Sequence, residues 1–311
     1  MITWRDGTPG DFRQTVDDLS TRIAAGTAGC PKHLENSLSE HFAAIERGSP
    51  ERFGYSWDRY ADLLPEHEEQ FLRWTGLDKS FWKGVRFVDG GCGIGRNAFW
   101  PMIYGASGGL AVDVDDRTLA RARQNLAQFP TVEVRKQSIY EIPEENTFDI
   151  AFSIGVVHHL SDPDAAVAVL ARAAKPGGRV LVWLYGRENN GWIVYLFDPL
   201  RRALFSRMPL RLMHALSWPM TAFLWCILRL GLPLGAYYRL IRSFSFEHLR
   251  AIVFDHMIPR IALYYPRAEA EALLARAGLT EIRSTWVNEN SWSVIGRKPI
   301  DVSVADRNET C

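Results

Sequence analysis

The sequence has 311 residues, of which 47% are hydrophobic and 23% are charged, and its 36 basic and 36 acidic side chains give a formal net charge of zero. This composition is typical of a globular protein and does not favour a nucleic-acid binder. The cysteines at positions 30, 92, 226 and 311 lack the paired spacing of a metal site or a disulfide framework. The first residues lack the basic and apolar regions of a signal peptide. We therefore expect a cytoplasmic protein with reduced thiols and no metal ion.

The first part of the chain is polar and irregular. Helical patterns occur near residues 12–25 and 38–47, and a further amphipathic helix is predicted from apolar positions with roughly helical spacing. These positions are Leu63, Leu64, Phe71, Leu72 and Trp74. We interpret residues 1–80 as an N-terminal helical extension.

Residues 81–186 alternate between strand and helix patterns. Strands are predicted at 85–89, 110–114, 132–135, 148–154 and 179–185. Asp116 is expected to cap the helix after the second strand. Asp162 and Pro163 are expected to open the helix after the fourth strand, which the Lys175-Pro176-Gly177-Gly178 block closes. Such alternation predicts parallel strands joined by right-handed crossovers, with ligands at the carboxyl ends of the strands.

The alternation stops after Tyr185, and we interpret residues 187–265 as a helical, Arg-rich lid insert. From Pro199 to Phe246 the chain has no Asp or Glu and carries a charge of about +7. Its arginines are Arg201, Arg202, Arg207, Arg211, Arg229, Arg239 and Arg242. The apolar run 215–228 is too short to span a membrane. The insert is expected to cover an apolar ligand, and its arginines to contact a phosphate, a carboxylate or an anionic membrane surface. The alternative, favoured equally, is a helical cap whose arginines only face solvent.

The pattern of the core resumes after the insert. A helix is predicted at 267–277, followed by strands at 281–287 and 291–297 that pair antiparallel at the sheet edge. Residues 266–300 thus complete the core, and residues 301–311 form a polar tail. The predicted fold class is α/β, with a doubly wound, mostly parallel seven-stranded sheet.

A glycine-rich turn, Asp89-Gly90-Gly91-Cys92-Gly93-Ile94-Gly95, follows the first strand of this core. Read from Gly93 as Gly-x-Gly-x-x-Ala, with Asp113 twenty residues later, it matches a dinucleotide fingerprint. Read from Gly91, it is a Gly-x-Gly-x-Gly loop preceded by a carboxylate. The second interpretation is favoured because Asp89 would attract a ligand with an ammonium group and repel a pyrophosphate.

Four sequence blocks match the core of a known enzyme family in order and spacing: RFVDGGCGIGR, LAVDVDD, FDIAFSIGVVHHL and KPGGRVLVWLYG. They cover about a third of the chain, from about Arg86 to Tyr185. By these blocks the sequence resembles class I S-adenosylmethionine-dependent methyltransferases with a Rossmann-like fold. Within that class it is most similar to the small-molecule enzymes of ubiquinone and menaquinone synthesis.

The resemblance implies a binding site for S-adenosylmethionine. Gly91, Gly93 and Gly95, with Cys92 between them, would form the turn under the methionine part of the cofactor. Asp89 would anchor its ammonium group. Asp113, with Val114 beside it, would accept hydrogen bonds from both ribose hydroxyls, because a carboxylate has two acceptor oxygens. A helix-capping role is the alternative for Asp113.

Four further residues are expected around the cofactor by the same resemblance. Ser138 stands where relatives often carry an Asp that binds the adenine amino group, so this contact is expected to be weaker here. Ile139 would pack on the adenine face. Ser153 and Ile154, at the end of the fourth strand, would lie beside the cofactor.

The candidate catalytic residues are histidines and one tyrosine. A base is needed only if the methyl acceptor keeps its proton at neutral pH. His158 and His159, directly after the fourth strand, are the first candidates, although packing is the commoner role of this block in the family. His256 and Tyr140 are further candidates, for which an ordinary packed or solvated side chain is the better interpretation.

The sequence therefore predicts an S-adenosylmethionine-dependent methyltransferase that acts on a small or lipid-like acceptor. An anionic group on this acceptor is an open option. Base-methylating enzymes usually have Asn or Asp, then Pro-Pro and an aromatic residue, where this chain has Ser153-Ile154-Gly155-Val156, so no nucleic-acid substrate is expected. Two alternatives stay open at this point: a nicotinamide-dependent oxidoreductase and a non-catalytic cofactor-binding protein. Peripheral membrane contact through the Arg-rich insert is a separate hypothesis.

Overall fold

The computed structural model describes residues 52–55, 63–205, 208–230 and 236–300. These residues belong to one compact unit that begins at Glu46. The helical patterns near 12–25 and 38–47, Arg207 and the tail 301–311 lie outside the described residues, so the predictions made for them are not addressed by the structure.

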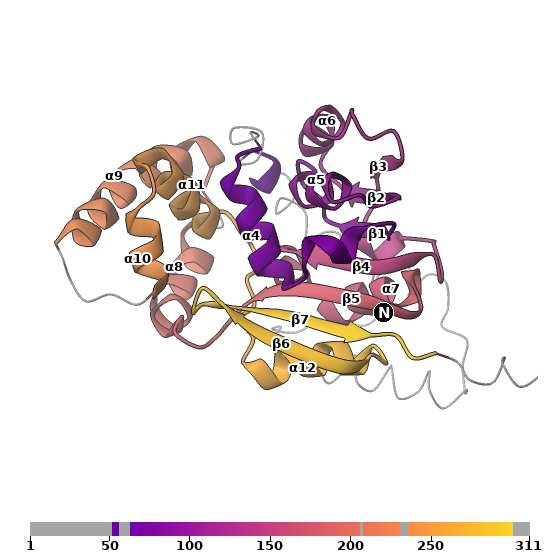
Figure 1. The fold of residues 1–311 in the computed structure, drawn as a ribbon. Helices are drawn as coiled ribbons and strands as arrows, with labels where there is room; N and C mark the ends of the chain where they lie inside the picture. The colour runs from indigo at the N-terminus through magenta and orange to yellow at the C-terminus, as the bar shows by residue number, and fades with distance from the viewer. Residues whose placement is uncertain (1–51, 56–62, 206–207, 231–235, 301–311) are drawn as a thin grey trace, which may run out of the picture. The chain divides into compact units, whose positions relative to one another are not determined.

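Seven strands form one twisted sheet at the centre of this unit (Figure 1). They are β1 (Arg86–Gly90), β2 (Gly108–Asp113), β3 (Val132–Lys136), β4 (Phe148–Ile154), β5 (Ala174–Tyr185), β6 (Thr280–Val287) and β7 (Ser291–Arg297). The strand order is β3-β2-β1-β4-β5-β7-β6, in which β1 to β5 run parallel and β7 is antiparallel to β5 and β6. The order reverses at β1, so the topological switch point lies between β1 and β4. The predicted fold class is confirmed.

Helices cover both faces of the sheet. They are α4 (Glu66–Thr75), α5 (Arg96–Ile103), α6 (Asp116–Asn125), α7 (Pro163–Ala173) and α12 (Arg267–Arg276). Because side chains alternate along a strand, Val88 packs into a cluster with α7 and α12, whereas Phe87 packs into a cluster with α4, α5 and α6. The central strands β1, β2 and β4 are therefore buried on both sides, which explains their almost continuous apolar runs, whereas the edge strands β3 and β6 are partly exposed.

Two predicted helix boundaries differ from the structure. Asp115, not Asp116, caps α6, because its carboxylate accepts hydrogen bonds from the backbone N–H groups of Arg117 and Thr118. Helix α7 begins after Asp162, as predicted, but ends at Ala173. The Lys-Pro-Gly-Gly block that was expected to close it forms the beginning of β5, where Gly177 has a φ of 76°.

The segment after β5 is helical in its described parts. It consists of a π-helical turn at Ile193–Phe197, α8 (Asp198–Ala203), α9 (Leu210–Arg229), α10 (Ala236–Arg242) and α11 (Phe246–Met257). Arg201 is buried, donates to the Asp198 carboxylate and to the Pro259 carbonyl, and so holds the insert together instead of facing a ligand. Among the described helices, none is long and apolar enough to cross a membrane.

Candidate active site

The glycine turn after β1 has the backbone geometry that the sequence required. The N–H groups of Gly91 and Cys92 both donate to the Val112 carbonyl, at 2.9 and 2.8 Å, which ties the turn to β2. Gly91, Gly93 and Gly95 have φ values of 79°, 53° and 78°, which L side chains rarely adopt. A Cβ atom on Gly91 would also lie 2.5 Å from Val156. The turn is therefore closely packed against the segment that follows β4.

Asp89 lies at the end of β1 and is fully buried. Neither carboxylate oxygen has a hydrogen-bond partner among the described residues. Burial, followed by the nearby charge of Asp113, raises the pKa of Asp89 well above its usual value, and the Arg96 guanidinium opposes this. A buried carboxylate without partners is unfavourable in the free protein, and a cationic ligand at the turn would compensate its charge.

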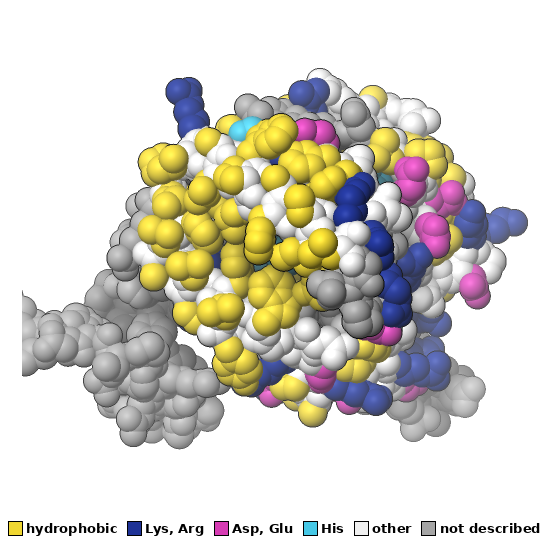
Figure 2. All heavy atoms as spheres, turned by 90° about the vertical axis from the view of Figure 1, so that its left-hand side faces the viewer, with side chains coloured by type: hydrophobic (Ala, Val, Ile, Leu, Met, Phe, Trp, Pro, Cys, Tyr) yellow, Lys and Arg dark blue, Asp and Glu magenta, His cyan; other side chains and the backbone are white. Residues whose placement is uncertain are grey.

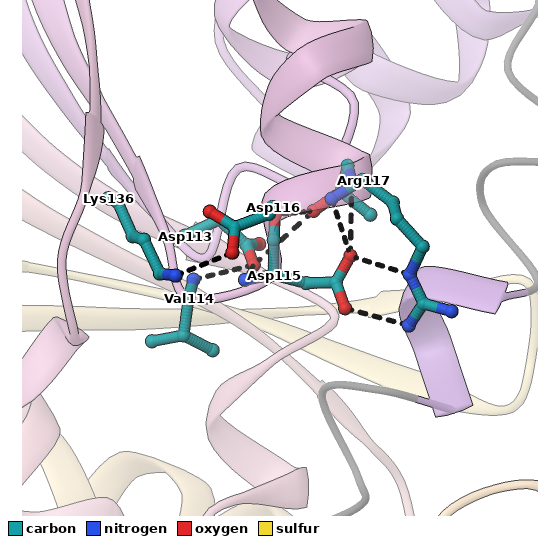
Figure 3. Close-up of polar contacts among 7 residues, drawn as sticks. Asp113, Val114, Asp115, Asp116, Arg117 and Lys136 are labelled. Carbon is teal, nitrogen blue, oxygen red and sulfur yellow. Dashed lines mark hydrogen bonds and ion pairs between the residues drawn. The ribbon is translucent and has the colours of Figure 1, made fainter.

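Asp113 ends the neighbouring strand β2 and faces the same turn. Its Oδ2 accepts from the Gly93 N–H at 2.9 Å. Its Oδ1 accepts from the N–H groups of Val114 and Asp115, at 2.7 and 3.0 Å (Figure 3). Burial raises the pKa of Asp113, although these backbone donors act in the opposite direction. A carboxylate has about four lone-pair sites, and these three donors occupy three of them, so one site on Oδ2 remains for a hydroxyl of a ligand.

The acidic neighbours of Asp113 have other roles. Asp115 pairs with Arg117 at 2.8 Å, and Asp116 pairs with Lys136 at 2.6 Å across the end of β3 (Figure 3). The first ion pair lies within the start of α6, and the second joins α6 to β3. Asp113 is thus the member of the acidic run that faces the glycine turn.

The remaining predicted cofactor residues have mixed surroundings. Cys92 is buried in the cluster with α5 and α6, whereas Val114 is exposed beside Asp113. The Ser138 hydroxyl accepts from the Tyr140 N–H at 3.3 Å, and Ile139 lies in the core against α7, with only 6% of its surface exposed. In its contact with Tyr140 the Ser138 hydroxyl is the acceptor, so its proton stays available for another partner, and the cofactor roles of Ser138 and Ile139 stay predictions.

The residues at the end of β4 pack against the same turn. The buried Ser153 hydroxyl donates to the Gly90 carbonyl at 2.7 Å, which fixes β4 to the end of β1. Ile154 is buried in the cluster with α5 and α6. Both residues therefore lie beside the glycine turn, where they were expected.

Three of the four catalytic candidates gather at the carboxyl ends of β4 and β5. The ring centroids of His158 and His159 lie 4.2 Å apart, and that of Tyr185 lies 4.0 Å from His158. The His256 ring, from α11 of the insert, lies 6.0 Å from that of Tyr185. Val156, which packs on Gly91, is two residues from His158, so the cluster is one short segment away from the glycine turn.

The two adjacent histidines differ in their hydrogen bonds. The Nδ1 atom of His159 lies 2.7 Å from the Ile261 carbonyl. Because a carbonyl only accepts, Nδ1 carries the proton and Nε2 keeps its lone pair. His158 is fully buried, and neither ring nitrogen has a partner among the described residues. Burial lowers the pKa of His159 to about 4 and that of His158 well below its usual value, so both are neutral at pH 7.

Tyr140 contacts residues at α7, and not the histidine cluster, in its hydrogen bond with Asp162 and in its ring packing. Its hydroxyl accepts from the Asp162 N–H at 3.2 Å, at the start of α7, and its ring packs with the α7 side of the core. His256 shares the low pKa of about 4, which arises from burial and from the positive charge of Arg201. The structure thus gives Tyr140 a structural contact and places His256 near the histidine pair.

Two parts of the site were missed or only loosely anticipated from the sequence. Tyr185 is the last residue of β5, a position where ligand contacts are common in parallel sheets, and this rule alone could have singled it out. The segment 52–55 also contributes: the Phe53 ring lies 4.9 Å from that of His159, and a Cβ atom on Gly54 would overlap the Asp115 carboxylate. No sequence pattern indicates the second contact.

Comparison with known proteins decides between the cofactors that the glycine turn permits. A family described as a methyltransferase domain matches residues 88–182, which include Asp89, the glycine turn, Asp113 and the segment after β4. This segment is a class I methyltransferase domain. Its cofactor is S-adenosylmethionine, and the oxidoreductase alternative is not favoured.

Curated relatives of this methyltransferase domain match less than their full length. The ubiquinone biosynthesis O-methyltransferase of Dechloromonas aromatica is 27% identical over 141 residues, covering 44% of this chain and 60% of the relative. That of Hahella chejuensis is 30% identical over 141 residues, covering 44% and 59%. The chain thus spans about three fifths of the length of these relatives. An O-methyltransferase family protein from Burkholderia thailandensis has the same fold, with a TM-score of 0.50, 12% identity, and coverage of 87% of this chain and 70% of that one.

The residues of the methyltransferase domain fit its cofactor. Asp89 offers a buried carboxylate without a hydrogen-bond partner for the ammonium group of the methionine part. Asp113 offers acceptor oxygens at the end of the next strand, and the glycine turn between them lets a ligand approach the backbone. The assignment of each residue to a particular group of the cofactor remains a proposal.

Proposed function

We propose that this protein transfers a methyl group from S-adenosylmethionine to a hydroxyl group of a small, largely apolar acceptor. The observation that carries the proposal is the cluster of His158, His159 and Tyr185, one short segment from the glycine turn. The printed function of the curated relatives, O-methylation in ubiquinone biosynthesis, supports a hydroxyl as the acceptor group.

The surroundings of the cluster favour an apolar acceptor. Aromatic rings of Phe53, Trp183 and Tyr264 lie within 4.9 to 5.9 Å of the ring centroids of the cluster. The histidines are neutral at pH 7, so the cluster brings no net positive charge of its own. Such a lining favours an aromatic or lipid-like molecule over a strongly charged one.

His159 is proposed as the general base. Its Nδ1–H is held by the Ile261 carbonyl, which leaves Nε2 to accept a proton. The bound cofactor would supply an electrophilic methyl group on its sulfonium. Nε2 of His159 would take the hydroxyl proton as the acceptor oxygen receives the methyl group, and the cofactor would leave with the electron pair of its bond to that group. The products are the methyl ether, S-adenosylhomocysteine and a protonated His159.

The test is methyl transfer by the full chain. Purified protein is incubated with S-adenosylmethionine carrying a radiolabelled methyl group and a panel of hydroxylated aromatic compounds with and without an apolar tail. We expect label in at least one hydroxylated compound and none in its pre-methylated analogue. A protein that binds the cofactor but labels neither the panel nor any fraction of a cell extract would refute catalysis and leave the binding domain in place.

A further inference from the structure

Helix α9 exposes apolar side chains where a surface helix usually exposes polar ones. Apolar residues recur at spacings of three and four along its solvent side, and all of them are exposed. They are Leu212, Ala215, Pro219, Phe223, Cys226 and, at the end of the helix, Leu230. Phe223 has 69% of its surface exposed.

The buried side of α9 is the more polar one. Ser217 and Thr221 are fully buried there, beside Met213 and Leu228. Their hydroxyls donate to carbonyls of the same helix, those of His214 at 2.8 Å and Ser217 at 2.7 Å, so they cost little to bury. Helix α9 is therefore not simply apolar on every side, as a helix in a protein core would be. Its exposed apolar residues need another explanation.

A second exposed apolar row runs along the π-helical turn and α8. Its members recur every four residues: Trp192, Leu196, Leu200 and Leu204. Tyr195 and Leu196 are 70% and 72% exposed. Figure 2, which looks at the side of the molecule formed by the helical insert, shows hydrophobic side chains gathered in a broad patch with basic side chains at its margin. Broad exposed apolar patches mark surfaces that contact a partner or a membrane.

The basic residues flank the α9 row in a regular way. Arg211 and Arg229 are exposed and each precedes an apolar residue of the row by one position. They are 18 residues apart, which is five helical turns, so they lie on the same side of the row. From Pro199 to Phe246 no acidic residue accompanies them. An apolar face bordered by arginines is the pattern of helices that lie in a membrane interface.

We propose that the exposed face of α8 and α9 docks on an anionic lipid bilayer. The apolar rows enter the interface and the arginines pair with lipid phosphates. A symmetric dimer through the same face is less favourable, because it would bring arginines together without acidic partners. This proposal concerns where the protein binds and does not depend on methyl transfer.

The experiment is vesicle co-flotation of the full chain. One set of vesicles is pure phosphatidylcholine, and the other contains about one quarter phosphatidylglycerol. We expect recovery with the anionic vesicles that falls at least about tenfold in the double variant Leu196→Ser and Phe223→Ser. The double variant Arg211→Gln and Arg229→Gln should lose about fivefold per arginine on anionic vesicles and little on neutral ones.

Ile103→Ser is the matched control, because Ile103 is 50% exposed but lies at the end of α5. It should leave flotation unchanged. Unfolding temperatures of all variants, measured in parallel, separate loss of binding from loss of folding. The proposal is wrong if the full chain floats with neither vesicle. It is also wrong if the serine variants float as well as the native chain, or if they only dissociate a dimer.

Discussion

The Nδ1 atom of His159 lies 2.7 Å from the carbonyl oxygen of Ile261, 102 residues later in the chain. This contact links the segment after β4 to the segment that follows α11. It fixes the imidazole tautomer and leaves Nε2 as the proton acceptor. The proposed acid–base chemistry therefore depends on the insert 187–265 being in place, because Ile261 belongs to it.

The first prediction concerns catalysis by His159. His159→Gln should lower kcat by at least about a hundredfold, as loss of a general base does, while affinity for S-adenosylhomocysteine changes little. His248→Gln, in α11 but outside the histidine cluster, is the control and should retain activity. Equal rates for the native chain and His159→Gln would remove the proposed base.

The second prediction concerns stability at acidic pH. Burial lowers the pKa of His159 from 6.5 to about 4, so the folded state resists its protonation. Its contribution is fully present above pH 6.5, where the histidine is neutral in both states, and is lost as the pH falls towards 4. Relative to His159→Gln, the native chain should therefore lose about 2 kcal/mol of unfolding free energy across this window. Urea unfolding at a series of pH values measures the difference; parallel curves would contradict the shift.

The third prediction concerns Asp89. Its pKa is raised in the folded state, so an ionised Asp89 destabilises the free protein at neutral pH. This penalty disappears as the pH falls from the raised pKa towards the ordinary value of 3.8. Asp89→Asn should therefore raise the unfolding temperature at pH 7.5 without ligand, with a smaller gain at pH 5, and should weaken binding of S-adenosylhomocysteine. A variant that is less stable at pH 7.5 and still binds would show that the carboxylate has a different role.

The fourth prediction concerns the packing of the glycine turn. Gly91 and Gly278 have similar φ values, 79° and 76°, but only Gly91 has a neighbour within 4 Å of an added Cβ. Gly278→Ala measures the backbone cost, which is about 1 kcal/mol. Gly91→Ala should cost more than this and also reduce cofactor affinity, because Val156 must move. Equal losses of unfolding free energy in the two variants would mean that the turn accommodates the extra atom freely.

The sequence predicted the sheet well because its central strands are buried on both faces and the connections contain glycine and proline. The error at α6 arose because Asp115 and Asp116 are the same residue type, so the sequence does not distinguish them as N-caps. Only the backbone shows that Asp115 precedes the first turn. The position of Arg201 was unpredictable for a related reason. It forms an ion pair with Asp198, just outside the Arg-rich stretch, and donates to the carbonyl of Pro259, 58 residues later in the chain.

The candidate site also has a part that the sequence predicted and a part that only the structure shows. Asp89 and Asp113 were singled out by the resemblance to class I methyltransferases, and Asp89 also by the charge that it places beside the glycine turn; both follow predicted strands of the core. The contacts of His159 with Phe53 and Ile261 join segments more than 100 residues apart, and no local pattern encodes them. The cofactor and catalytic roles of individual residues therefore stay predictions until they are measured.

Calorimetric titration with S-adenosylhomocysteine tests the central claim most directly, using the native chain, Asp113→Asn and the neighbouring control Asp116→Asn. We predict one binding site in the native chain, retained in Asp116→Asn and weakened at least about tenfold in Asp113→Asn, with no heat from NADH. Binding of NADH in place of S-adenosylhomocysteine, or equal affinity in all three proteins, would contradict the site described for the glycine turn.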